Sequence, residues 1–189
     1  MRGSLNASAV QLRDFMGDFF DFERITGSGE VTADFASSGG SMYALMNGLN
    51  GNGTINFGRG ELLGFDLLAM VRNLGKAFED RTGSTIFNSI TATFEIVDGV
   101  VSNVDLELLA PLLEVVGEGT IGIGEQVIDY RVTPKFLGGD SEFSVPVLIT
   151  GAWSNLKFRP DLDGLLNLRA QEAAKAAEQE LKKAAEEIH

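Results

Sequence analysis

Residues 111–166, PLLEVVGEGTIGIGEQVIDYRVTPKFLGGDSEFSVPVLITGAWSNLKFRPDLDGLL, alternate apolar and polar side chains through one short segment after another. Successive side chains of a β-strand point to opposite faces, so this period of two predicts strands with one apolar face. Tyr130 and Val132 share such a face, and the last long strand is expected to carry Phe143, Val145, Val147 and Ile149. Because short turns join the segments, we expect consecutive strands to be antiparallel neighbours.

The alternation also extends upstream of this stretch, as far as Phe87. Asp98-Gly99 lies between two alternating segments and is a strong hairpin signal, while Pro111 interrupts the pattern before it resumes. The sequence therefore predicts a meander of strands. The apolar side chains predicted to share one face of its first half are Ile90, Ala92, Phe94, Ile96, Val104, Leu106, Leu108, Leu113 and Val115.

Three short helices are predicted upstream of the meander. Apolar residues at helical spacing mark residues 10–22, Ser41 can cap a helix that ends near Met46, and Asp66 can cap a third helix at residues 67–78. Strands are expected at residues 30–35 and 54–57, with the asparagines and glycines of residues 47–53 forming a break.

The C-terminal segment has a different composition. Residues 170–188 are rich in alanine with mixed charge, which predicts a long helix with a thin apolar stripe. Its charged side is either a solvated face or a docking surface for a partner. At 189 residues the chain fits one domain, so we expect a flexible start at residues 1–9, one sheet domain at residues 10–160, and this helix at residues 161–189.

Composition excludes several kinds of chemistry. The chain has no cysteine, and its single histidine is the last residue, His189. Thiolate sites, ordinary zinc sites and Ser-His-Asp machinery therefore have no residues to form them. The formal net charge of −12, without clusters of lysine and arginine, argues against nucleic acid as a partner. Carboxylate-only or Ser-Lys chemistry stays open in principle.

Two short motifs have structural explanations. Residues 117–122, GEGTIG, match the glycine spacing of a dinucleotide loop, but the residues that follow predict a strand where that loop needs a helix. Glycines here fit a bend of the sheet or a crossing neighbour. Asp161 and Asp163 stand at a predicted helix start, where capping is favoured over a cation site. We therefore expect no catalytic residue, no cofactor and no metal, and a protein that is not an enzyme.

A resemblance to a known family rests on the order of three segments: PLLEVVGEGTIGI (111–123), IDYRVTPK (128–135) and VPVLITGAWSNLKFRPDL (145–162). They resemble the C-terminal region of the AsmA-like proteins, envelope proteins of Gram-negative bacteria related to TamB and to the bridge-like lipid-transfer proteins. Upstream, FDFERITGSGEVTADF (20–35) and LNGNGTINFGRGELLGFDLLAMVRNL (49–74) resemble the preceding repeat and its strand-turn-helix unit.

The resemblance implies that the sheet curves into a half-barrel or groove. The expected fold class is thus α+β, with a curved, largely antiparallel β-sheet, two or three short helices and a long C-terminal helix. Relatives usually begin with a membrane anchor, whereas this sequence has no run of about 18 apolar residues. We therefore expect it to be the C-terminal piece of a longer protein that is anchored in the inner membrane and lies in the periplasm.

The function that the resemblance implies is non-enzymatic binding or guiding of phospholipid, or another acyl-chain lipid, between the inner and outer membranes. Expected partners are that lipid, upstream repeats of the same protein, and an envelope protein. The alternative is a structural or protein-interaction end-cap without lipid binding. Which face of the sheet is a groove and which is packed core is left open. The candidate lipid-facing residues are Phe94, Ile96, Leu106, Leu108, Val115, Tyr130, Val132, Val145, Val147 and Ile149.

Overall fold

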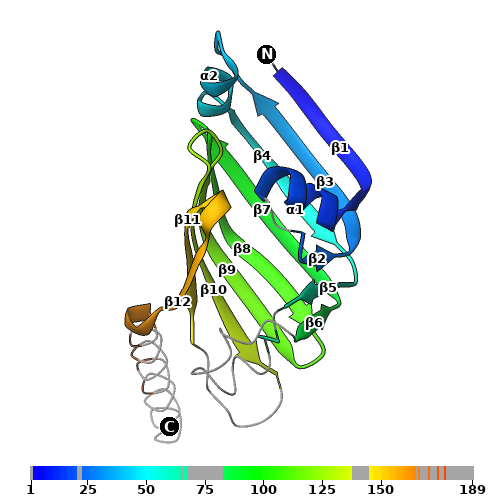
Figure 1. The fold of residues 1–189 in the computed structure, drawn as a ribbon, viewed down its shortest axis with the longest axis vertical. Helices are drawn as coiled ribbons and strands as arrows, with labels where there is room; N and C mark the ends of the chain where they lie inside the picture. The colour runs from blue at the N-terminus through cyan, green and yellow to red at the C-terminus, as the bar shows by residue number, and fades with distance from the viewer. Residues whose placement is uncertain are drawn as a thin grey trace, which may run out of the picture.

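The chain folds mainly as one large antiparallel sheet that curves and stays open (Figure 1). A computed structural model of the chain describes residues 2–20, 23–64, 66–67, 83–137, 145–164, 166, 170, 174 and 177. Nine strands form the large sheet, in the order β1-β3-β4-β7-β8-β9-β10-β11-β12, and three more form a small sheet, in the order β2-β5-β6. Among the strands that the structure describes, β1 and β12 stand at the two ends of the order and form the edges of the large sheet.

The strands of the large sheet are β1 (Arg2–Gln11), β3 (Ser28–Ala36), β4 (Asn50–Phe57), β7 (Ser89–Val97), β8 (Val100–Ala110), β9 (Leu113–Gly122), β10 (Val127–Phe136), β11 (Val147–Ala152) and β12 (Lys157–Pro160). The small sheet consists of β2 (Ile25–Thr26), β5 (Gly60–Leu63) and β6 (Ser84–Phe87). Among the described residues, the helical elements with defined bounds are α1 (Leu12–Phe20), α2 (Met42–Asn47) and the 3-10 turn η1 (Trp153–Asn155).

Most of the predicted elements are confirmed. The meander from β7 to β11 is antiparallel throughout, and Asp98 and Gly99 both have positive φ, as a tight hairpin turn requires. Ser41 caps α2, because its hydroxyl accepts a hydrogen bond of 3.1 Å from the Ala44 amide. The glycine motif at residues 117–122 lies within β9, so it is strand and not a nucleotide loop.

The expected flexible start is instead a strand. Arg2–Gln11 forms β1, which pairs along its length with β3, and an irregularity separates Ala7 from Val10. Its small and polar residues have little β-propensity of their own, so the hydrogen bonds to a partner distant in sequence stabilise it. In the same way Asn50 to Gly53, expected in a break, begin β4 between β3 and β7.

Val104 was predicted on the apolar face and lies on the other side. A bulge in β8 between Asn103 and Leu106 adds one residue to that strand relative to both neighbours, β7 and β9. Such a bulge changes the alternation of side chains. Val104 is therefore 80% exposed, while Asn103 turns onto the apolar face and is buried.

The last long strand begins later than predicted. β11 starts at Val147, after Val145 and Pro146, which are buried but lie outside any strand. Most of the predicted helix at residues 67–78 and of the long C-terminal helix lies outside the described residues, although Leu162 to Gly164 are helical. No described helix has the length and apolar character needed to cross a membrane.

Candidate functional site

Strand register brings nine of the ten predicted lipid-facing residues onto one face of the large sheet. Residues paired across neighbouring strands project to the same side, and the pairs Ile90 with Leu108, Leu108 with Val115, and Tyr130 with Ile149 connect the strands from β7 to β11. We call this side the apolar face. Its predicted members are Phe94, Ile96, Leu106, Leu108, Val115, Tyr130, Val132, Val147 and Ile149. Val145 is buried just before β11.

One end of the apolar face is packed core. There α1 and the small sheet lie over the large sheet (Figure 1), and their Leu12, Ile25 and Phe87 join a buried cluster. Leu108 and Val115 belong to this cluster, so these two candidates pack against protein. Leu106 and Val132 pack against its border while remaining partly exposed. Core and candidate binding surface are therefore two ends of the same face, and not opposite faces of the sheet.

The other end of the apolar face is less covered. Of the elements that the structure describes, α1 and the small sheet contribute their buried side chains to the core end only. Phe94, Tyr130 and Ile149 are half-buried there, and Leu5 of β1 is 47% exposed. Ile96 is the exception, being buried. We call this end, from the Phe94 row upward to α2, the uncovered half of the apolar face.

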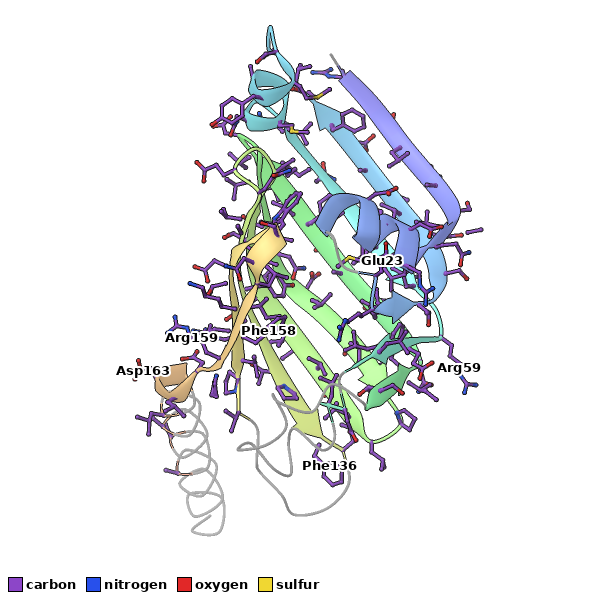
Figure 2. All side chains as sticks on the ribbon, viewed as in Figure 1. Glu23, Arg59, Phe136, Phe158, Arg159 and Asp163 are labelled. Carbon is purple, nitrogen blue, oxygen red and sulfur yellow. The ribbon has the colours of Figure 1, made fainter. Side chains whose placement is uncertain are left out.

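Several members of the uncovered half were not among the predicted candidates. Phe35 on β3, Ile121 on β9, Ile128 on β10 and Phe158 on β12 all face the same way by register. Figure 2 shows Phe158 and its neighbour Arg159 on opposite sides of β12. The alternation of Ile128 with Tyr130 was a usable signal, whereas the short β12 has too few residues to reveal a period.

Aromatic rings on the apolar face lie across glycines of the neighbouring strand. Phe35 pairs with Gly3, Phe94 with Gly53, and Tyr130 with Gly119. In each pair the ring occupies the space that a Cβ of the glycine would need; a Cβ on Gly119 would lie 2.7 Å from a Tyr130 ring carbon. The rings therefore lie along the sheet, where glycine's lack of a side chain permits the close approach.

A hydrogen-bonded network crosses the sheet at the bulge. The Tyr130 hydroxyl donates to Asn103 Oδ1, and Asn103 Nδ2 donates to the Thr93 carbonyl oxygen at 2.7 Å and to Asp105 Oδ1 at 2.8 Å. Hydrogen bonds from the Thr93 hydroxyl and amide hold the pKa of Asp105 below its ordinary value. Burial, together with the charges of Asp105 and Glu118, raises the pKa of Tyr130. The tyrosine is therefore kept protonated, as its donated hydrogen bond requires.

The opposite face of the large sheet is polar. The hydroxyls of Thr32 and Thr54 lie 2.8 Å apart across β3 and β4. Arg131 on β10 forms ion pairs with Glu118 at 3.1 Å and with Asp161 at 2.8 Å. Asp161 Oδ1 also accepts the Gly164 amide at 2.9 Å, so this aspartate caps a helix start. One face thus suits water, and the other suits apolar contact.

Two sequence comparisons with known proteins identify the family of this chain. The model of the AsmA family matches residues 1–106, which run from β1 into β8. The chain is also 25% identical over 168 residues to Protein AsmA of Escherichia coli strain K12, an alignment that covers 80% of this chain and 27% of that protein. The chain thus spans about a quarter of the length of this relative. No solved structure matches it. Because the family match covers more than half of its residues, the chain belongs to the AsmA family.

Proposed function

We propose that this chain is a non-enzymatic lipid-binding module whose apolar face holds the acyl chains of phospholipid or a similar amphiphile. The mechanism is physical. An acyl chain on the apolar face exchanges water for protein contact, which stabilises it by about 0.8 kcal/mol for each buried CH₂. No bond is made or broken, and the polar face keeps the module hydrated while lipid is bound.

The observation that carries this proposal is the division of a single face into a packed and an uncovered half. Side chains such as Phe94, Tyr130 and Ile149 are too apolar for a solvated sheet face, yet among the described elements the covering ones lie over the opposite end. A partly exposed apolar surface of this kind is typical of a binding site for lipid or protein. The rings of Phe35, Phe94 and Tyr130 lie beside glycines of the neighbouring strand, so they take up space that a side chain there would fill.

Family membership supports a location of this chain in the bacterial envelope. AsmA-family proteins act in the envelope of Gram-negative bacteria, and we place this chain in the periplasm, as part of a longer protein anchored in the inner membrane. There it would guide phospholipid between the inner and outer membranes, together with upstream repeats of the same protein and an envelope partner.

Lipid extraction and native mass spectrometry of the purified chain test the proposal. We expect masses of bound acyl lipid after purification from cells, and uptake of a fluorescent fatty acid by the delipidated chain. An apo mass combined with no uptake of the fluorescent fatty acid would overturn lipid binding by this module.

A second function is favoured by one observation, the long free edge of β1. After Arg2 this ten-residue strand carries no charge, whereas β12 at the other edge has Lys157, Arg159 and Pro160, residues that discourage further pairing. The β1 edge could therefore receive a strand of another protein in a structural end-cap without lipid. Replacing Ala7 with proline should disrupt that pairing and leave fatty-acid uptake unchanged. Loss of uptake with unchanged partner binding would count against the end-cap.

A further inference from the structure

Three turns meet at the end of the large sheet opposite the core. The Gly99 amide of the β7–β8 turn donates to the Leu49 carbonyl after α2 at 2.8 Å. The Ile123 amide of the β9–β10 turn donates to the Gly99 carbonyl at 2.9 Å. Asn50 Nδ2 donates to Asp98 Oδ1 at 3.3 Å, which ties β4 to the hairpin. These bonds fix α2 and both turns as one tip, at the upper end of the view in Figure 1.

Exposed apolar side chains surround this tip. On α2, Met42 is 69% exposed and Tyr43 is 64% exposed, and Met46 is exposed beside them. We call the set consisting of Met42, Tyr43, Met46, Val97, Val100 and Val127 the apolar collar. Its three valines belong to one row on the polar face of the sheet, where Val97 pairs with Val100, and Gly122 pairs with both Val100 and Val127.

This valine row is out of place on a solvated face. Lower on the same face the row members include hydroxyls and charges, such as Thr93, Glu118 and Arg131. Val104 and Leu148 also lie on that face, but they are not gathered at one end. Apolar residues at the tip therefore lie both on α2 and on the polar face of the sheet. Exposed apolar side chains that occur singly need no explanation, but a group gathered on one end marks an interaction surface.

Charge distinguishes the kinds of partner that fit. The chain has a formal net charge of −12, yet residues 35–58, which include α2, contain no Asp, Glu, Lys or Arg. Carboxylates near the collar are Asp98, which accepts from Asn50, Glu125 in the β9–β10 turn, and Glu95 and Asp129 in the next row of the same face. The one basic residue of the valine row is Arg2, at its β1 end. Carboxylates outnumber it around the collar, so this surface offers little attraction to an anionic membrane face or an acidic protein. Methionine, tyrosine and valine suit the boundary between headgroups and acyl chains.

We propose that the apolar collar docks onto the surface of a neutral phospholipid bilayer. Its side chains project from a rim formed by α2 and two turns and not from one flat face, which fits a deformable bilayer better than a rigid protein partner. The uncovered half of the apolar face ends at this rim, since Phe35, Ile121 and Ile128 occupy its uppermost rows. Docking would therefore bring that face to the bilayer. The collar is separate from the apolar face, so either proposal can fail alone.

Flotation with phosphatidylcholine vesicles tests the docking. The chain should float with the vesicles, and the double variant Met42→Glu, Tyr43→Glu should partition roughly tenfold less or worse, because two apolar contacts are replaced by charges. The control is Leu112→Glu, an apolar residue that is 47% exposed in the β8–β9 turn at the opposite end of the sheet. Equal loss in both variants, or no flotation of the unchanged chain, overturns the proposal.

A fluorescent label locates the contact. Because the chain contains no cysteine, Tyr43→Cys and, on the exposed polar face of β3, Glu30→Cys can each carry one environment-sensitive dye. We expect a blue shift with vesicles, and quenching by brominated lipid, at position 43 only. Equal responses at both positions contradict docking by the collar. A change of oligomeric state in the glutamate variant without vesicles would identify the collar as an interface between copies and also overturn the proposal. Uptake of fatty acid by that variant should remain, which separates this test from that of lipid binding.

Discussion

Placing a carboxylate on the uncovered half of the apolar face should abolish lipid binding without unfolding the protein. Ile149 is suited to this because it is half-buried in β11, between Tyr130 and Phe158 of the adjoining strands. In Ile149→Asp, an acyl chain crossing that row would lose contact along about three methylenes. At about 0.8 kcal/mol for each methylene, the loss is about 2.4 kcal/mol, which corresponds to a dissociation constant roughly 50-fold higher.

Two further variants separate loss of binding from loss of fold. Leu148→Asp introduces the same charge one residue away, on the polar face, where register pairs position 148 with Arg131 and Arg159. It should bind lipid as the unchanged chain does. Val115→Asp places the carboxylate inside the core cluster, where an unpaired buried charge costs several kcal/mol, a large part of a typical total stability of about 5–15 kcal/mol. It should unfold.

Displacement of a fluorescent fatty acid, with circular dichroism as a check on folding, measures all three variants. Unchanged affinity in a folded Ile149→Asp would refute the assignment of the apolar face as the binding surface. An equal loss of affinity in Leu148→Asp would refute it as well, since a general effect of added negative charge would then explain both results.

Three predictions concern stability. Tyr130→Phe should lower the free energy of unfolding by about 1–2 kcal/mol at neutral pH, because it leaves a buried amide oxygen unpaired. Since the pKa of Tyr130 is raised in the folded protein, its contribution to the free energy of unfolding is complete below about pH 10, where unfolded tyrosine titrates, and falls as the pH rises further. Urea unfolding at pH 8 and pH 11 should therefore show a smaller difference between wild type and variant at pH 11. Gly3→Ala should destabilise by about 1–3 kcal/mol because the three heavy atoms nearest to its Cβ all belong to the Phe35 ring, the closest at 2.9 Å, and combining it with Phe35→Ala should give less than the sum of the single losses; additive losses would contradict the ring placement. Leu113→Ala, at 2% exposure, should lose about 2–5 kcal/mol, while thermal unfolding of Leu112→Ala next to it should show a shift smaller by at least half, and similar shifts would place the core elsewhere.

The parts of the fold that sequence could predict depend on local pattern. Alternation identified the strands from β7 to β11, since a period of two needs only neighbouring residues, and the signals at Ser41 and Asp98-Gly99 are equally local. Nine of the ten candidate residues fall on one face for the same reason. Once consecutive strands pair antiparallel, the residues that face each other across two strands, and every second residue from them, fall on one side of the sheet.

What sequence could not predict depends on contacts distant along the chain. β1 exists because β3 pairs with it, and nothing in GSLNASAV favours a strand by itself. The bulge in β8 shows the same limit, because Asn103 and Val104 exchange faces to satisfy the network around Tyr130. Leu108 and Val115 look like Tyr130 and Ile149 in their alternation. Only the position of α1 and the small sheet decides that the first two are core.

The pairing of aromatic rings with glycines has a consequence for motion along the sheet. Where Phe94 covers Gly53 and Tyr130 covers Gly119, bulk on one strand fills the hollow of the next, so the relief of the face is low across these strands. A hydrocarbon chain lying on such a surface meets much the same contacts when it shifts by one methylene. The energy barrier to sliding would then be low. Because the described surface offers no pocket that fixes the end of an acyl chain, it would discriminate weakly between acyl chains of different length.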